Sequence, residues 1–475
     1  MIRIDVLPDE VLLEIFDFYV DMSLSVYRGK KEAEAWQSLA HVCRRWRSLV
    51  FGSPRRLNLQ LWCTSETPVK DLLDVWPALP LVIRSNMTLS SGTDNVIAAL
   101  EQRNRVCDVL LWCPARWQLE KVLAAMQVPS PELTDLQLVS DDETPPVIPD
   151  SLLDGSAPCL RRFELSGIPF PGLPKLLLSA THIVELLLFN IPHSGYISPE
   201  AMVAALSVLS SLRTLTLYFR SPQSRPDRES RILPSPKRSI VPALFLISFK
   251  GVTEYLEELM THIDTPQLRE MNIAFFNQID FDCRRLAQFI NRTPTLRALD
   301  KAHVLFSDTT AGVELCYHDW SKLGNVNLQI SISCREPDWQ ISSMEQVCNF
   351  SLHPISTVED LYIDRQHHLQ SVPVWENVAI EDTLWLQLLR SFTAVKNLYL
   401  SKEFAPGIAA ALQQLVGGRT TEVLPSLQNI FVEGLQSSGP FRENIGQFVA
   451  ARQLSNPSVA ISVCDNYYYW DMERM

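Results

Sequence analysis

The sequence predicts an α/β chain in which a short helical segment precedes a curved solenoid, with parallel strands on the concave face and helices on the convex face. Three observations lead to this prediction. Two amphipathic helices occupy the first fifty-four residues. After residue 100 an apolar pattern Φ-x-x-Φ-x-Φ, in which Φ is any apolar residue, recurs ten times. The segments between the recurrences often have helical periodicity, so strands and helices should alternate along the chain.

The first helix is expected to begin at Pro8. Proline suits the first turn of a helix, and the carboxylates of Asp9 and Glu10 favour its positively polarised end. Apolar residues then recur at the spacing of one helical face. They are Leu12, Ile15, Phe16 and Tyr19 in the first helix and Trp36, Leu39, Ala40 and Cys43 in the second. Helices this short bury little apolar surface against each other, so we expect the segment to contact a partner.

Three sequence features of this segment together resemble an F-box, the helical module that docks on the Skp-type adaptor of cullin–RING ubiquitin ligases. They are the leading Leu7-Pro8, the helical stretch from Glu10 to Phe16 and the ending Val42-Cys-Arg-Arg-Trp-Arg47. The resemblance implies that six residues contact the adaptor and that three more support or join them. The six are Leu7, Pro8, Val11, Leu12, Ile15 and Phe16, and the three are Val42, Cys43 and Trp46.

Between Val20 and Ala35 the chain departs from the F-box pattern, so the middle helix and its contacts stay undefined. The alternative interpretation of the whole segment is an ordinary helical cap on the domain that follows.

Composition excludes several classes of protein. The net charge of −12 argues against a protein that coats nucleic acid, because phosphate neutralisation needs a basic surface. The ten cysteines form no Cys-x-x-Cys pair, no signal peptide is recognisable, and the longest apolar run, from Val241 to Phe249, is far shorter than a membrane span. We therefore expect an intracellular protein of the cytoplasm or nucleus, with free thiols and with neither nucleic acid nor membrane as a partner.

The repeated pattern is the second strong signal. Its ten copies begin at Val106, Leu133, Leu160, Ile183, Leu212, Leu244, Leu268, Val358, Val395 and Leu427. A degenerate copy is expected at Leu296 and Leu299, followed by a strand over 326–332, and a last strand is expected over 459–463. Helices are expected over 202–209, 254–262, 284–291, 384–392 and 408–416.

Units of this kind, 23 to 37 residues long, resemble leucine-rich repeats, with spacing too irregular and asparagines too few for the regular consensus. An F-box followed by such degenerate repeats resembles the large F-box families of fungi. The expected domains are an F-box over 1–56, a connecting or capping segment over 57–100, a solenoid over 101–465 and a tail over 466–475. Residues 220–238 are basic and proline-rich, which predicts a disordered insertion. An ordinary α/β domain with leucine-rich strands remains the alternative to the solenoid.

A search for catalytic motifs finds no phosphate-binding loop, no His-Glu-x-x-His, no nucleophile elbow and no dinucleotide fingerprint. We therefore expect no enzyme, catalytic residue, metal or cofactor. The resemblance implies a substrate-recognition subunit of a cullin–RING ubiquitin ligase, which binds a Skp-type adaptor, a cullin through that adaptor, and an unknown target protein. The alternative is a protein-binding scaffold that uses its F-box outside a ligase.

The target surface can be located by strand periodicity. Within each copy, the residue between the last two apolar positions points away from the core, because successive side chains of a strand alternate between faces. In the last three copies these residues are Tyr362, Tyr399 and Phe431, which predicts an aromatic ladder. Our hypothesis is that the ladder is the centre of the target site. Its polar surround would be Asp364, Asn397 and Glu433.

The alternative is that the aromatic segment from Tyr467 to Trp470 folds back over the ladder and makes it part of the core.

Overall fold

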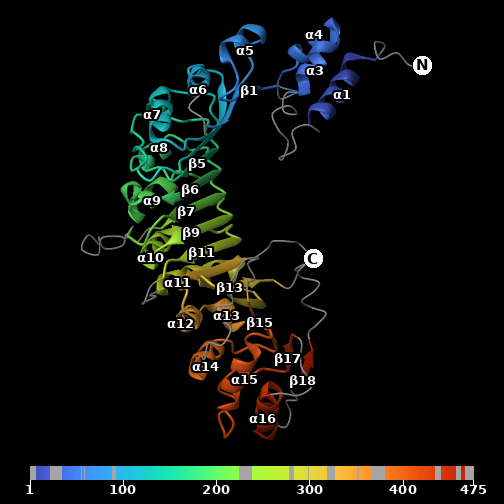
Figure 1. The fold of residues 1–475 in the computed structure, drawn as a ribbon, viewed down its shortest axis with the longest axis vertical. Helices are drawn as coiled ribbons and strands as arrows, with labels where there is room; N and C mark the ends of the chain where they lie inside the picture. The colour runs from blue at the N-terminus through green and yellow to red at the C-terminus, as the bar shows by residue number, and fades with distance from the viewer. Residues whose placement is uncertain are drawn as a thin grey trace. The chain divides into compact units, whose positions relative to one another are not determined.

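The computed structural model of the chain describes residues 7–21, 35–54, 56–57, 59–87, 92–223, 238–277, 283–297, 299–317, 327–349, 352–365, 380–433, 440–455 and 462–465. It divides into two compact units, Met1–Ile197 and Ser198–Met475 (Figure 1). Most of the predicted insertion over 220–238 and all of the predicted tail over 466–475 lie outside the described residues. Within the described residues no helix is long and apolar enough to cross a membrane.

The first unit opens with three helices and continues as strands that alternate with helical turns. Its α-helices are α1 (Asp9–Asp21), α3 (Ala35–Val42), α4 (Arg44–Gly52), α5 (Val69–Val75), α6 (Thr93–Leu100), α7 (Arg116–Ala125) and α8 (Leu173–Leu177). Its strands are β1 (Leu61–Cys63), β2 (Leu81–Asn86), β3 (Val106–Trp112), β4 (Asp135–Val139), β5 (Arg162–Ser166) and β6 (Glu185–Ile191), joined in part by the short 3-10 turns η2 (Leu152–Gly155) and η3 (His193–Gly195). All five neighbouring pairs of strands are parallel. The parallel ladder already includes β1 and β2, inside the segment predicted as a connection or cap.

The second unit repeats the alternation of strands and helices. Its helices are α9 (Pro199–Leu206), α10 (Thr253–His262), α11 (Arg284–Arg292), η4 (Pro294–Leu296), α12 (Pro337–Asn349), α13 (His353–Ser356), α14 (Asp382–Arg390), α15 (Ala405–Gln413) and α16 (Pro440–Ser455). Its main strands lie in the spatial order β7 (Thr214–Phe219), β9 (Leu246–Gly251), β11 (Glu270–Phe275), β14 (Leu328–Ser333), β13 (Thr310–Cys316), β12 (Lys301–Phe306), β15 (Asp360–Arg365), β16 (Asn397–Leu400), β17 (Asn429–Val432) and β18 (Ser462–Asp465). A separate two-stranded sheet pairs β8 (Ser239–Ile240) with β10 (Ile263–Asp264).

The strand register confirms the repeat predicted from the sequence. In every pair of neighbouring copies within a unit, the second apolar position of one copy lies opposite the second of the next, as Leu136 does to Phe163 and Leu361 to Leu398. The second and third apolar positions are at most 3% exposed in all ten copies. Each copy therefore buries its apolar residues against its neighbours and the helices behind them, which is how a solenoid forms its core.

The five predicted helices are also confirmed, as α9, α10, α11, α14 and α15, within a few residues at each end. The start of α9 follows from two residues of the sequence. Ser198 Oγ accepts the N–H of Ala201, and Pro199 occupies the first helical position.

One part of the prediction is wrong, because not all strands are parallel. Strand β13 runs antiparallel to both of its neighbours, β12 and β14. Only Ser307, Asp308 and Thr309 connect β12 to β13, and a parallel return needs a crossover of a dozen or more residues. The turn is closed by the N–H of Ser307, which donates to Thr310 O at 2.8 Å.

The degenerate copy was also placed wrongly. Leu296 and Leu299 are buried, but neither lies in a strand. Strand β12 instead pairs Ala302 with Leu361 and Val304 with Ile363. The degenerate copy is therefore Leu299-x-x-Ala302-x-Val304. Its second position is a small alanine, so the apolar pattern is weak there in the sequence.

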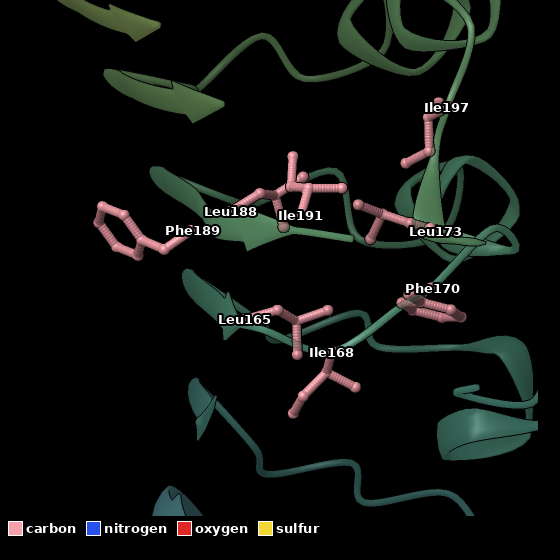
Figure 2. A pocket seen from close by; sticks show the side chains of 9 residues that line it. Leu165, Ile168, Phe170, Leu173, Leu188, Phe189, Ile191 and Ile197 are labelled. Atoms are coloured by element: carbon pink, nitrogen blue, oxygen red, sulfur yellow. The ribbon is translucent and has the colours of Figure 1, made fainter. Parts of the chain in front are cut away.

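Helical segments cover one face of the main strands in each unit (Figure 1). The buried apolar side chains lie between these two layers. Figure 2 shows this interior in the first unit: Leu165, Leu173 and Leu188 lie on the side of the helical layer, whereas Phe189 projects from the opposite face of β6. The pocket that they line encloses only about 10 Å³. That volume holds at most one water molecule, so the pocket is a packing gap and offers no ligand site.

Buried polar side chains satisfy backbone groups where the strands end. Gln118 Nε2 donates to Met87 O at 2.7 Å, and Gln340 Nε2 donates to Ser307 O at 2.9 Å. In α16 the guanidinium of Arg452 donates to three backbone carbonyls of 420–424 at 2.6–3.1 Å. These bonds replace hydration that the buried carbonyls lose.

The strand register predicts a difference between two adjacent residues of β4. Leu136 is fully buried and Gln137 is partly exposed on the other face. Leu136→Ala is expected to lower the free energy of unfolding by roughly 2–5 kcal/mol, because it leaves a cavity. Gln137→Ala on the same strand should cost less than about 1 kcal/mol. Urea denaturation measures both, and equal losses would contradict the assigned faces.

Candidate functional site

The three helices over 9–52 form a small module with its own core. Leu12 and Phe16 of α1 are fully buried, and the ring of Phe16 packs 4.7 Å from that of Trp46 in α4. We expected Leu12 and Phe16 to contact a partner. That expectation needs correction, because both side chains point into the module and support its surface from within.

Two ion pairs link α1 to the chain at α4, one from Arg45 of α4 and one from Arg56 beyond its end. The guanidinium of Arg45 donates to Leu7 O at 2.6 Å and to Asp9 Oδ1 at 2.6 Å, so it holds the start of α1. Cys43, also predicted as a contact, is exposed and caps α4, where its Sγ accepts the N–H of Trp46 at 3.4 Å. A second ion pair joins Arg56 to Glu14.

The outward face of α1 remains apolar. Val11 is 42% exposed and Ile15 is 44% exposed, while Phe18, which the sequence interpretation missed, is 71% exposed. These residues follow the helical spacing i, i+4, i+7 and so share one stripe. Of the other predicted contacts, Pro8 and Val42 are exposed and Leu7 and Trp46 are half-buried.

An aromatic cluster joins the module to the first strands. Trp36 of α3 is 1% exposed, donates from Nε1 to Gln60 O at 3.1 Å, and has its ring 5.1 Å from Trp76 and 6.1 Å from Phe51. The sequence indicated that Trp36 lies on an apolar stripe but did not indicate its partner, because Trp76 follows α5, forty residues later along the chain.

The second unit contains the predicted aromatic ladder. The rings of Tyr362 and Tyr399 stack at 4.2 Å with an interplanar angle of 5°, and those of Tyr399 and Phe431 stack at 4.6 Å and 10°. The register places these three residues in one row across β15, β16 and β17. Neighbouring strands lie about 4.8 Å apart, so rings at equal register positions stack almost face to face.

The structure extends this ladder by one residue that sequence reasoning missed. The imidazole of His303 on β12 stacks on Tyr362 at 4.2 Å and 10°. His303 is 6% exposed, and burial, reinforced by the charge of Lys301, lowers the pKa of its imidazole to about 3. Its position was hidden in the sequence because the copy that contains it was misplaced.

The row continues into the hairpin with polar residues. Glu314 of β13 lies opposite His303, and Gln329 Nε2 donates to Glu314 Oε1 at 2.9 Å. Burial raises the pKa of the Glu314 carboxyl above its ordinary value. The ladder therefore has a polar end at β13 and an aromatic end at β17.

A parallel row of hydrogen-bonded side chains runs beside the rings. Asn429 Nδ2 donates to Asn397 Oδ1 and Asn397 Nδ2 donates to Asp360 Oδ1, both at 2.7 Å. On the other side of the rings, Asp364 and Glu433 are partly exposed. All three residues predicted as a polar surround, Asp364, Asn397 and Glu433, therefore lie on the same face as the ladder.

Exposure varies along the ladder. Tyr399 and Phe431 are partly exposed, whereas Tyr362 is only 1% exposed. Among the described residues, no group of three or more His, Cys, Asp or Glu could hold a metal ion. The ladder offers a rigid, preordered apolar surface with carboxylates beside it, which suits binding.

Comparisons with known proteins find a family match for the helical module. Residues 4–57 match the family described as F-box-like. No curated protein matches the chain. A solved structure that resembles it is the leucine-rich repeat-containing protein LegL7 from Legionella pneumophila, at 14% sequence identity and a TM-score of 0.27, covering 82% of this chain and 97% of that one. The repeat architecture of this chain follows from its own strand register.

The buried imidazole predicts how stability depends on pH. The unfolded chain binds a proton at His303 near pH 6.5, and the folded chain does so only near pH 3. Stability should therefore fall as the pH falls below 6.5. Between pH 7 and pH 5 the wild-type chain should lose about 2 kcal/mol more than His303→Phe, which keeps a ring and removes the titration. Urea denaturation at the two pH values measures this, and equal losses would contradict a neutral, buried imidazole.

Proposed function

We propose that this chain is a non-catalytic substrate-recognition subunit of a cullin–RING ubiquitin ligase. The F-box-like module over 4–57 binds a Skp-type adaptor, and through it a cullin, while the repeat units bind a target protein. The observation that carries the proposal is the apolar outer stripe of α1 on a module that matches the F-box-like family. In such an assembly the chain contributes proximity, because it holds the target near the ubiquitin-transferring subunits.

The adaptor surface is proposed from the division of α1 into two apolar stripes. One stripe, with Leu12 and Phe16, supplies the core of the module, and the other, with Val11, Ile15 and Phe18, remains exposed. A helix that needed only its own core would have a polar outer face. Exposed apolar side chains at helical spacing are typical of a helix that contacts a partner.

Replacement of the outer stripe tests this surface. Val11→Ser combined with Ile15→Ser is expected to abolish co-purification with a Skp-type adaptor, since apolar anchors at an interface centre each contribute about 2–4 kcal/mol. The melting temperature should stay near that of the wild type, because both side chains are exposed.

Asp17→Ser, an exposed polar position on the same helix, is the matched control and should bind normally. Adaptor recovery at wild-type yield from the double variant would refute the proposed surface. Recovery of the adaptor without a cullin would instead favour a scaffold that works outside a ligase.

The target surface is proposed to be the aromatic ladder with its polar surround. Tyr399 and Phe431 are held rigidly by stacking, so little conformational freedom is lost when a partner binds them. Aromatic residues are the preferred anchors of protein interfaces. The carboxylates of Asp364 and Glu433 would form the polar rim of this site, and Asn397 would stay in its hydrogen-bonded row.

Target capture tests this second surface. In cells depleted of the protein, targets should gain half-life, and re-expression of the wild-type chain should restore their turnover. Tyr399→Ser combined with Phe431→Ser is expected to fail in this rescue while still binding the adaptor. Gln137→Ser, on the open face of the first unit, is the control and should rescue. Full rescue by the double variant would place target recognition elsewhere.

A further inference from the structure

The open face around the ladder is rich in carboxylates as well as in rings. Strands β15, β16 and β17, with the residue that follows each of the last two, place nine alternating positions on that face. Among these nine described positions three are aromatic, three are acidic and none is Lys or Arg. They are Asp360, Tyr362, Asp364, Asn397, Tyr399, Ser401, Asn429, Phe431 and Glu433.

The charges that border these nine positions leave the excess of carboxylates in place. Three neighbouring couples of opposite charge cancel. They are Lys396 with Glu359 at 2.7 Å, Arg365 with Asp308 at 3.1 Å, and the adjacent Lys402 and Glu403. Lys301 of β12 adds one positive charge to the open face, but it is only 6% exposed. The surface around the rings is therefore negative.

The excess of carboxylates is local to the rings. The nine corresponding positions of β7, β9 and β11 hold one lysine, Lys250, and one carboxylate, Glu270, so they carry no net charge. They also hold a single aromatic residue, Tyr218. Negative charge on the open face of the second unit thus coincides with the ladder, and a partner of positive charge is the complementary one.

The spacing of rings and carboxylates suits particular side chains. Asp364 and Glu433 each lie two residues beyond a ladder ring on the same strand, which is about 7 Å at ~3.4 Å per residue. Arginine and lysine carry a cationic head on an apolar stem, and they bury the stem along apolar surface while the head stays polar. A stem laid on the exposed edges of Tyr399 and Phe431 points its head at the row of carboxylates.

We propose that the segment captured by the ladder is basic, with arginine or lysine stems on Tyr399 and Phe431 and their heads paired with Asp364 and Glu433. Arginine fits best, because its planar guanidinium pairs with a carboxylate through two hydrogen bonds. The inference rests on the proposed target surface and adds the chemical class of its occupant.

A binding experiment with defined peptides tests the class. The probes are two fluorescent peptides, Arg-Trp-Arg-Gly-Arg-Trp-Arg and the same peptide with Glu in place of each Arg. Fluorescence anisotropy measures their affinity for the full-length chain. The charge variant carries Asp364→Asn and Glu433→Gln, which keep the side-chain shapes. Glu270→Gln, on the same open face away from the rings, is the matched control.

The wild type should bind the basic peptide and not the acidic one. The charge variant should bind the basic peptide roughly 3- to 30-fold more weakly, which is the contribution of two half-exposed ion pairs. Glu270→Gln should bind it as the wild type does. Raising the salt concentration to 1 M should remove most of the difference between the wild type and the charge variant, because charges are then screened within about 3 Å.

Two results would overturn the inference. One is equal affinity of the wild type for the two peptides, and the other is unchanged affinity of the charge variant for the basic peptide. A reversed charge gives an independent reading that needs no change to the rings. Glu433→Lys, at a half-exposed position, should weaken binding of the basic peptide and strengthen binding of the acidic one. No shift in preference would also count against the inference.

The rescue experiment separates this inference from the proposed function. The peptide measurements use neither an adaptor nor a target, so they report on the class of occupant alone. In depleted cells the charge variant should restore target turnover less well than Glu270→Gln. Full rescue by the charge variant, with no rescue by Tyr399→Ser combined with Phe431→Ser, would refute a basic target and leave the target surface standing.

Discussion

The register between neighbouring parallel strands is the constraint on which the rest of this structure depends. Because side chains alternate at every residue, a slip of one position would move each apolar residue to the open face. The register is kept by backbone hydrogen bonds and by burial of two apolar positions per copy, such as Leu398 and Leu400. The side chains on the open face, including those of the aromatic ladder, are therefore aligned by the same register as these buried residues.

The antiparallel hairpin adds a polar residue to the aligned row without interrupting the row. Strand β13 lies between β14 and β12, so Glu314 falls beside His303 in the same row as the aromatic residues. Burial acts on both groups in the direction of the neutral form: it lowers the pKa of the imidazole and raises that of the carboxyl. A neutral ring can stack on Tyr362 without the cost of burying a charge.

The helical module uses its few apolar residues for two purposes. Leu12 and Phe16 hold the three helices together, and Val11 and Ile15 remain exposed on the next stripe of the same helix. The cluster around Trp36 and Trp76 anchors the module to the first strands. The exposed stripe of α1 is therefore separate from the packing that joins the module to the repeats.

The sequence by itself determined the repeat, its register, five of the helices, the module and three rings of the ladder. Those features depend on local periodicity, and periodicity is visible in a chain before it folds. Tertiary structure decided which apolar residues of α1 are core, since Leu12 and Ile15 belong to one apolar pattern and only packing distinguishes them. It also decided the direction of β13 and the place of His303 in the ladder. The direction of β13 follows from the three-residue turn after β12, which carries no apolar periodicity. The place of His303 depends on the pairing of β12 with β15, which is distant along the chain, and the small Ala302 left little apolar signal by which to align the two strands.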